Sequence, residues 1–320
     1  MKIATWNINS MNVRLPHVME WLGNHEPDVL VLQEIKQLTE KFPTAALADI
    51  GYHSIASGQK TYNGVAVISK TPASDPVTDF PGFEDPQRRI LATTIDGMRV
   101  VNLYVPNGSE VGSEKYEYKL RWLAALRDFL ESELAAHQNL VVLGDFNIAP
   151  ADEDVYDPEK WGDAILCSPL ERQALGKVTD LGLTDVFRKF EQPESMFSWW
   201  DYRAAGFRRN AGLRIDLILA SKGIAERCEG NLLAAHQEIE KLGLLRDRGL
   251  EIAWLADPVD KFFLQIQGSG RVRLPDGSRI RVGFADKNGH PYRSVGNEMV
   301  RRGYLAQHQV TGCCFAQDRF

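Results

Sequence analysis

The sequence predicts an α/β fold in which buried strands alternate with amphipathic helices. Short apolar runs at residues 3–8, 28–32 and 140–143 are typical of strands buried within a sheet. Residues 113–137 indicate one long amphipathic helix, because leucines recur along a single face at positions 120, 123, 126, 130 and 134. With 320 residues, the chain is long enough for one large domain or two ordinary ones.

The predicted elements follow one another in a regular order. Two further helices are expected at residues 13–24 and 183–190. Further strands are expected at residues 52–55, 64–69, 90–95, 98–104 and 214–221. Asp96-Gly97, between two of these strands, is a strong hairpin signal. Residues 151–177 are expected to form a long irregular loop, which in a compact domain is often functional.

Composition and charge restrict the possible functions. The chain is 44% apolar and 25% charged, as globular proteins are. It has neither a signal-peptide pattern nor an apolar run of roughly 18 to 20 residues, so we expect a cytoplasmic protein without a membrane partner. The four cysteines show no metal-binding spacing. A net charge of −6 argues against general attraction to nucleic acid, so DNA binding would require metal ions and a local arginine patch.

Polar side chains stand at the ends of several predicted strands. Asp145 and Asn147 lie two residues apart after an apolar strand, so on an extended chain they would point the same way. The same residue types also suit a simple turn. The other groups at strand ends are Asn7, Glu34, Tyr104 and Asp216. Hard oxygen ligands of this kind suit Mg²⁺, and a Mg²⁺ site near a basic surface suits phosphodiester hydrolysis.

A second stretch combines aromatic rings with arginines. Within residues 197–210 the sequence contains Trp200, Arg203, Phe207, Arg208 and Arg209. Such a stretch can form a basic surface on which bases stack. The alternative is an aromatic core cluster with a solvated basic rim.

Six motifs in order resemble exonuclease III, of the exonuclease/endonuclease/phosphatase superfamily. They are Thr5-Trp6-Asn7-Ile8-Asn9-Ser10, Leu32-Gln33-Glu34-Ile35-Lys36, residues 102–108, residues 144–150, Trp199-Trp200-Asp201-Tyr202-Arg203 and Arg214-Ile215-Asp216-Leu217. The resemblance covers about residues 1–228 and implies a four-layer α/β sandwich, with two mixed β-sheets packed face to face and helices outside. It also implies Mg²⁺- or Mn²⁺-dependent 3′→5′ exonuclease action on double-stranded DNA, cleavage at abasic sites and removal of 3′ blocking groups, by a monomer.

The resemblance also implies a role for each matching residue. Glu34 would bind the metal with help from Asn7, and Asp145, also near the metal, would orient or deprotonate the attacking water. Asn147 and Tyr104 would hold the phosphate. Asp216 matches a family acid near the metal and phosphate. The residues that would contact DNA are Trp200, Arg203, Phe207, Arg208 and Arg209.

The sequence departs from this family after about residue 228. The family's terminal strand carries Ser-Asp-His, yet none of the seven histidines here follows an aspartate. We expect the missing histidine to lower the rate by about 10² to 10⁴-fold. Residues 231–305, with Gln265-Ile266-Gln267-Gly268-Ser269-Gly270-Arg271, instead resemble an interior piece of membrane-bound lytic murein transglycosylase A.

Two domains are therefore expected, a nuclease domain at residues 1–228 that lacks its last strand and an unrelated β-rich fragment at residues 229–320. Two other functions stay open. One is a superfamily phosphatase that acts on lipid or sugar phosphates, against which the aromatic and arginine stretch argues. The other is a non-catalytic fusion protein that binds DNA or glycan.

Overall fold

The computed structural model describes residues 1–192, 194–201, 206–228, 270–273 and 279–282. The chain divides into two compact units, Met1–Leu233 and Ala234–Phe320. Among the described residues, no helix has the length and apolar character that crossing a membrane requires. The described part of the second unit is an antiparallel pair of strands, β13 (Gly270–Arg273) and β14 (Arg279–Val282).

The first sheet of unit 1 has four strands in the order β1-β2-β4-β3. Its strands are β1 (Ile3–Asn7), β2 (Val29–Gln33), β3 (His53–Ser57) and β4 (Val65–Ser69). β1 and β2 are parallel and the other pairs are antiparallel. Two helices, α1 (Met11–His25) and α2 (Thr44–Asp49), pack on one face through Val18, Leu22 and Leu47.

The second sheet has six strands in the order β5-β6-β7-β8-β12-β9. Its strands are β5 (Ser74–Val77), β6 (Ile90–Ile95), β7 (Met98–Tyr104), β8 (Leu140–Asp145), β9 (Leu183–Asp185) and β12 (Asp216–Ser221). β7 and β8 are parallel, and Asp96-Gly97 forms the predicted hairpin between β6 and β7. The helices α3 (Glu114–Ala136) and α5 (Pro169–Thr179) cover its outer face.

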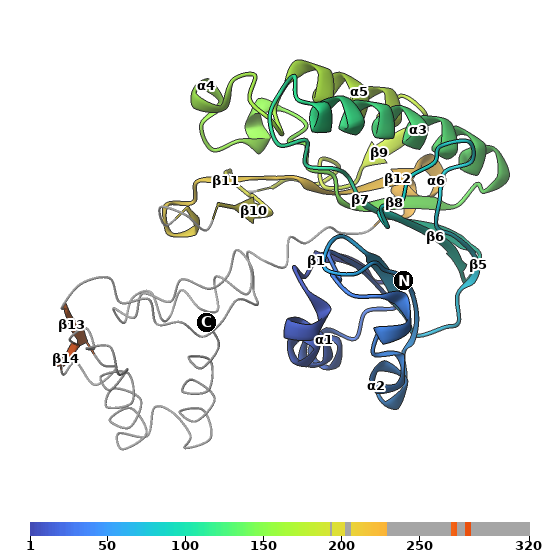
Figure 1. The fold of residues 1–320 in the computed structure, drawn as a ribbon, viewed down its shortest axis with the longest axis horizontal. Helices are drawn as coiled ribbons and strands as arrows, with labels where there is room; N and C mark the ends of the chain where they lie inside the picture. Colours follow the sequence, from blue (N-terminus) through green and yellow to red (C-terminus); the bar gives the residue numbers. More distant parts are fainter. Residues whose placement is uncertain (193, 202–205, 229–269, 274–278, 283–320) are drawn as a thin grey trace. The chain divides into compact units, whose positions relative to one another are not determined.

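The two sheets pack face to face through a shared core. Val31 and Val67 of the first sheet join Val100, Val141 and Leu143 of the second in one buried cluster. Figure 1 shows α3 and α5 outside the second sheet and α1 and α2 outside the first. The order of layers is therefore helix, sheet, sheet, helix, which confirms the predicted four-layer α/β sandwich.

Shorter elements fill the connections. They are η1 (Thr39–Lys41), η2 (Asp152–Asp154), α4 (Pro158–Trp161), β10 (Trp199–Trp200), η4 (Phe207–Arg209), β11 (Gly212–Leu213) and α6 (Lys222–Arg227). β10 and β11 pair as a small antiparallel ribbon, in which Trp200 lies opposite Gly212.

Two local predictions are wrong. Residues 183–190 do not form a helix, because Leu183 to Asp185 pair with β12 as the short strand β9. Residues 151–177 are not one irregular loop, because α5 begins at Pro169. Ser168 and Glu171 form a capping box at the start of α5, and Pro169 stands at its first position, where proline is favoured.

A glycine allows the strands that lead to the candidate site to approach closely. Gly144 in β8 has φ +142°, and a Cβ atom there would clash with the carbonyl oxygen of Leu103 in β7. No other residue fits this position without displacing the backbone. The next pair in register brings Tyr104 beside Asp145.

Candidate active site

The predicted strand-end residues gather at one edge of the two sheets. Asn7 ends β1 and Glu34 follows β2, while Tyr104 and Asp145 end the parallel strands β7 and β8. β12 runs antiparallel to β8, so it contributes its first residue, Asp216, at the same edge. Each side chain comes from a different strand, and pairing of the strands brings them together.

Asn7 connects the two acidic side chains that come from different sheets. Its Nδ2 donates to Glu34 Oε1 at 3.0 Å and to Asp145 Oδ2 at 2.9 Å. Its Oδ1 accepts from the backbone N–H of Asn9 at 3.1 Å. The nitrogen of Asn7 therefore faces the acids, and a direct bond from Asn7 to a metal would require a rotated amide.

Glu34 is surrounded by hydrogen-bond donors. Its Oε1 also accepts from the Tyr104 hydroxyl at 2.9 Å, and its Oε2 lies 2.7 Å from Lys36 Nζ. Burial alone would raise the pKa of Glu34, but the contacts with Lys36, Asn7 and Tyr104 outweigh burial and lower it. The backbone of Glu34 adopts φ +54°, an uncommon conformation of the kind that clusters at functional sites.

Asp145 and Asp216 form a crowded acidic pair. They lie directly opposite each other in the β8–β12 register, and Asp145 is 5% exposed. Burial, the charge of Asp216 and that of Glu34 raise the pKa of Asp145 well above its usual range. Burial also raises the pKa of Asp216 to about 6, although a hydrogen bond with Ser198 opposes the shift. A proton or a cation held here relieves the repulsion.

Asn147 sits in a tight turn after β8. Its φ is +50°, and its backbone N–H donates to Asp145 Oδ1 at 2.9 Å. Its side chain donates to the carbonyl of Val105 at 3.0 Å and accepts from Asn107 Nδ2 at 3.1 Å. The two interpretations of this stretch are therefore compatible, because the segment is a turn and also joins the strand-end cluster.

Tyr104 keeps its proton in this environment. Burial and the neighbouring charges of Glu34 and Asp145 raise the pKa of its phenol. The guanidinium of Arg89 lies 4.6 Å from the ring centroid, and Arg89 Nη1 donates to the backbone carbonyl of Tyr104 at 3.1 Å. The hydroxyl therefore acts as a hydrogen-bond donor near neutral pH.

The donor set of this edge fits a hard divalent cation. Glu34, Asp145 and Asp216 supply carboxylate oxygens. Burial is the main cause of the raised pKa of both aspartates, and for Asp145 the charges of Asp216 and Glu34, which a cation would neutralise, add to it. As they stand, the described residues include no group of three or more His, Cys, Asp or Glu side chains at metal-binding distances. A cation shared by all three acids would therefore require these side chains to move closer together.

The aromatic and arginine stretch divides into a packed part and an exposed part. Trp200 is 3% exposed, its ring packs edge-to-face on Phe207 at 5.1 Å, and its Nε1 donates to Asn210 Oδ1 at 3.0 Å. In this conformation Trp200 supports the loop and presents no face for base stacking. Arg208 and Arg209 are exposed on η4. Arg203 lies outside the described residues.

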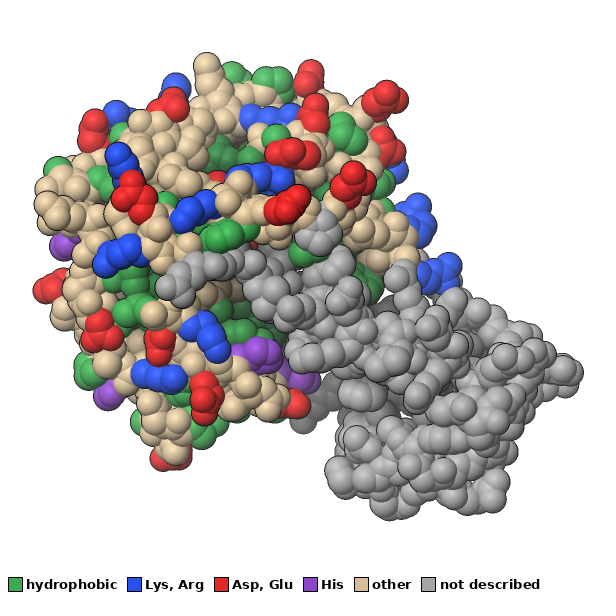
Figure 2. All heavy atoms as spheres, turned by 180° about the vertical axis from the view of Figure 1, so that it is seen from behind, with side chains coloured by type: hydrophobic (Ala, Val, Ile, Leu, Met, Phe, Trp, Pro, Cys, Tyr) green, Lys and Arg blue, Asp and Glu red, His purple; other side chains and the backbone are tan. Residues whose placement is uncertain are grey.

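The described part of the face shown in Figure 2 has no broad basic patch. Acidic and basic side chains alternate across the described part of that face. This pattern agrees with the net charge of −6.

Sequence reasoning overlooked several polar residues around the cluster. Lys36 belongs to a quoted motif but had no role, and it proves to contact Glu34. Ser198 accepts from the backbone N–H groups of Ile215 and Asp216, each at 3.0 Å, and so fixes the start of β12. The spacing of Ser168 and Glu171 was a visible capping-box signal for the start of α5, although it gave no sign of the contact between Glu171 and Lys119.

Comparisons with known proteins agree with this geometry. Residues 4–238 match the endonuclease/exonuclease/phosphatase family. Exodeoxyribonuclease III of Haemophilus influenzae is 38% identical over 245 residues, which cover 71% of this chain and 90% of that protein. Residues 213–314 match the MltA-specific insert domain, as the second resemblance predicted.

Solved structures show the same fold. A 3′ phosphatase from Neisseria, bound to a product DNA hairpin, is 51% identical with a TM-score of 0.70 and covers 71% of this chain and 88% of its own. An AP endonuclease from Archaeoglobus fulgidus is 39% identical with a TM-score of 0.69 and covers 72% of this chain and 90% of its own. These matches confirm the predicted enzyme class, a hydrolytic nuclease. The chain belongs to the endonuclease/exonuclease/phosphatase family.

Proposed function

We propose that this chain is a Mg²⁺- or Mn²⁺-dependent DNA repair nuclease that acts on double-stranded DNA at 3′ ends and at abasic sites. The observation that supports it most is the bridge that Asn7 forms between Glu34 and Asp145, with Asp216 opposite Asp145. This arrangement brings acidic side chains from both sheets to one edge, which suits a divalent cation and a phosphodiester.

The family resemblance implies a role for each side chain, and the contacts seen here support those roles. Glu34 and Asp145, with Asn7 between them, would hold the metal, which supplies Lewis-acid polarisation of the phosphate. Asp145, which the resemblance matches to the family's water-activating acid, would orient the attacking water or take its proton. Asn147 would hold the phosphate through its N–H donors, and Tyr104 through its O–H, which would turn to the phosphate from Glu34, its partner in this structure. Asp216 adds charge beside Asp145.

DNA contacts fall to the loop that carries η4. Arg208 and Arg209 are exposed there and contact backbone phosphates, while Arg203 and Phe207 contact the distorted duplex. Trp200 positions Phe207 through the edge-to-face contact between their rings. These contacts are local, as the acidic net charge requires.

We place 3′-end processing first among the nuclease activities. The solved structures described as a 3′ phosphatase and as a 3′-5′ exonuclease from Neisseria are 51% and 52% identical to this chain. The AP endonuclease from Archaeoglobus fulgidus is 39% identical. Removal of a 3′ phosphate and cleavage on the 5′ side of an abasic site both hydrolyse a bond between phosphorus and a 3′ oxygen. The two substrates can therefore be compared in one assay.

A panel of matched DNA duplexes tests the proposal. One duplex carries a 3′ phosphate, one a recessed 3′ hydroxyl and one an abasic-site analogue, each with EDTA, Mg²⁺ or Mn²⁺. We expect cleavage that needs metal, that is fastest on the 3′ phosphate, and that Asp145→Asn abolishes. A folded protein that hydrolyses lipid or sugar phosphates but no DNA would contradict the proposal, and metal-independent DNA binding without cleavage would favour the non-catalytic alternative.

The division into a nuclease domain at 1–228 and a separate fragment at 229–320 is part of the proposal, as is a cytoplasmic monomer. Limited proteolysis with mass spectrometry tests the division, and we expect cuts between residues 228 and 240. A full-length resistant core would contradict it.

A pull-down with muropeptides tests the glycan-binding alternative, and light scattering tests whether the protein is a monomer.

A further inference from the structure

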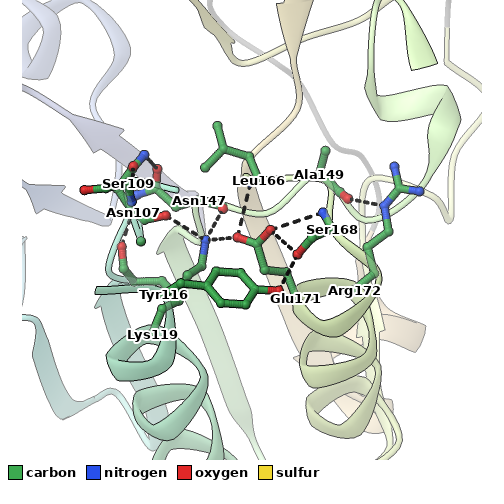
Figure 3. Close-up of polar contacts among 12 residues, drawn as sticks. Asn107, Ser109, Tyr116, Lys119, Asn147, Ala149, Leu166, Ser168, Glu171 and Arg172 are labelled. Atoms are coloured by element: carbon green, nitrogen blue, oxygen red, sulfur yellow. Dashed lines mark hydrogen bonds and ion pairs between the residues drawn. The ribbon is translucent and has the colours of Figure 1, made fainter. Parts of the chain in front are cut away.

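An ion pair with no solvent exposure lies directly behind the candidate active site. Lys119 on α3 contacts Glu171 on α5, and both side chains are 0% exposed. Figure 3 shows the two side chains pointing toward each other between the helices, below the loop that carries Asn147. A buried ion pair contributes little to stability compared with an apolar pair of the same volume, so its presence here calls for another reason.

The ammonium group of Lys119 uses all three of its protons on fixed partners. Besides Glu171 Oε1, Nζ donates to the carbonyl of Asn147 at 2.7 Å and to the carbonyl of Asn107 at 3.2 Å. Two of the three partners are therefore backbone atoms of residues beside the candidate site. A charged donor holds each carbonyl more firmly than a neutral one would.

Glu171 is fixed from its other side. Its Oε1 accepts from the backbone N–H of Leu166 at 3.2 Å. Its Oε2 accepts from the N–H of Ser168 at 3.1 Å and from the Ser168 hydroxyl at 2.6 Å. The hydroxyls of Ser168 and Tyr116 lie 2.7 Å apart, which completes the network in Figure 3. Because the carboxylate cannot turn, it fixes Nζ of Lys119 in space.

The two carbonyls that Lys119 holds belong to residues that also bond with each other. Asn107 Nδ2 donates to Asn147 Oδ1 at 3.1 Å. The backbone of Asn147 has φ +50°, a conformation that few residues adopt without support. One ammonium group therefore fixes the backbone on both sides of this side-chain contact, and with it the direction of the Asn147 amide.

We propose that Lys119 is a positioning residue, which Glu171 holds in place and which sets the conformation of Asn147 for the reaction without touching the substrate. The proposal rests on the proposed function, in which Asn147 holds the scissile phosphate. A small misplacement of such a group can cost about 10²-fold in rate. The effect of Lys119 should therefore appear in kcat and leave KM nearly unchanged.

The first test is Lys119→Met, which keeps most of the side-chain volume and removes the charge and its three bonds. We expect kcat on the 3′-phosphate duplex to fall about 10- to 100-fold with KM within about twofold of the parent. In NMR spectra of protein labelled selectively with ¹⁵N-asparagine, the chemical shifts of the Asn147 and Asn107 amides should differ from those of the parent. Lys115→Met is the matched control, because Lys115 is exposed on the same helix.

A double variant separates positioning from stability. Lys119→Met alone leaves a buried carboxylate without its counter-charge, and it lowers Tm for that reason. In Lys119→Met/Glu171→Gln no buried charge remains at this place, and the introduced amide oxygen can still accept a hydrogen bond from Ser168. We expect Tm to recover while kcat and the Asn147 signals stay altered. If kcat returned with Tm, the pair would be structural only and the proposal would be overturned.

The two proposals fail in different ways. If the parent protein cleaves no DNA in either metal, the proposed function fails, and Lys119 is then judged on the asparagine signals alone. Unchanged Asn147 and Asn107 signals in Lys119→Met would overturn the positioning role whether or not the parent is active. Shifted signals with full kcat would overturn it as well.

Discussion

Asp145 and Asp216 face each other across the pairing of β8 and β12, one at the end of its strand and the other at the start. Two acids in this register repel each other wherever both are ionised, and partial burial strengthens the repulsion. The protein therefore keeps an unfavourable pair at the point where the proposed cation would bind. Natural proteins commonly keep such local instability where function needs it.

This pair predicts how stability depends on pH without metal. The pKa of Asp216 is raised to about 6 from 3.8, so between these pH values the folded chain holds protons that the unfolded chain has released. The free energy of unfolding therefore decreases as pH rises through that window, because the folded state is the more protonated one. We expect the EDTA-treated protein to lose roughly 1–2 kcal/mol between pH 5 and pH 7 from this source.

Urea unfolding at pH 5 and pH 7 measures the effect. Asp216→Asn should flatten the pH dependence and stabilise the metal-free protein at pH 7, while it lowers activity. Saturating Mg²⁺ should also flatten the dependence for the parent, because the ion favours the ionised acids. An identical pH slope in parent and variant would contradict the prediction.

A second prediction concerns the bridge between the sheets. Asn7→Ala removes the donor that both Glu34 and Asp145 share. We expect a loss of about 1–2 kcal/mol in the free energy of unfolding and a fall in kcat of about 10²-fold. Chemical denaturation and the DNA panel measure the two effects. Asn24→Ala, at an exposed position of α1, serves as the control and should change neither.

A third prediction concerns the close approach of β7 and β8. Gly144→Ala would drive a methyl group into the carbonyl oxygen of Leu103, at a φ of +142° that alanine disfavours. The strands must move apart, so we expect a loss of about 2–4 kcal/mol in the free energy of unfolding and a displaced Asp145. Gly23→Ala meets open space within α1 and should be neutral or slightly stabilising. Equal Tm values for the two variants would refute the prediction.

A fourth prediction concerns DNA contacts at η4. Arg209→Ala removes one exposed cation, so duplex affinity should fall about equally for all sequences and the slope of log K against log salt should drop by about 1. Fluorescence anisotropy at several salt concentrations measures this slope. Lys177→Ala removes an exposed cation from α5 and should leave the slope unchanged. The same slope in both variants would place the DNA elsewhere.

A fifth prediction follows from the missing Ser-Asp-His motif. On the same 3′-end substrate, kcat of this chain should be about 10² to 10⁴-fold below that of exodeoxyribonuclease III from Haemophilus influenzae. Parallel steady-state assays at saturating substrate compare kcat of the two proteins. Equal rates would show that another group of this chain replaces the histidine.

Local patterns in the sequence were sufficient to predict alternating strands and helices and the polar residues at strand ends, whereas the four layers were predicted from the resemblance to exonuclease III. Apolar runs located the buried strands, and polar residues at their ends located Glu34, Asp145 and Asp216. The sequence was not sufficient to predict strands that form only because they pair with a distant segment. β9 has only three residues, too few for a periodic pattern, and exists through its pairing with β12.

The contacts of single side chains were also beyond prediction. Lys119 and Glu171 lie 52 residues apart, and neither carries a local sign that the other is its partner. Trp200 belongs to an aromatic stretch that is compatible with a DNA surface or a packed loop, and only its 3% exposure identifies the packing. Composition gives the types of residue present, whereas packing decides which of them face solvent.

The Asn7 bridge has a consequence for how the chain can lose its function. Glu34 belongs to one half of the sandwich and Asp145 to the other, and one amide nitrogen spans them. A shift of one sheet relative to the other would break these two hydrogen bonds, even if both sheets stayed folded. Turnover would then fall before spectroscopic unfolding begins, so that residual activity reports the alignment of the two sheets rather than the amount of folded protein.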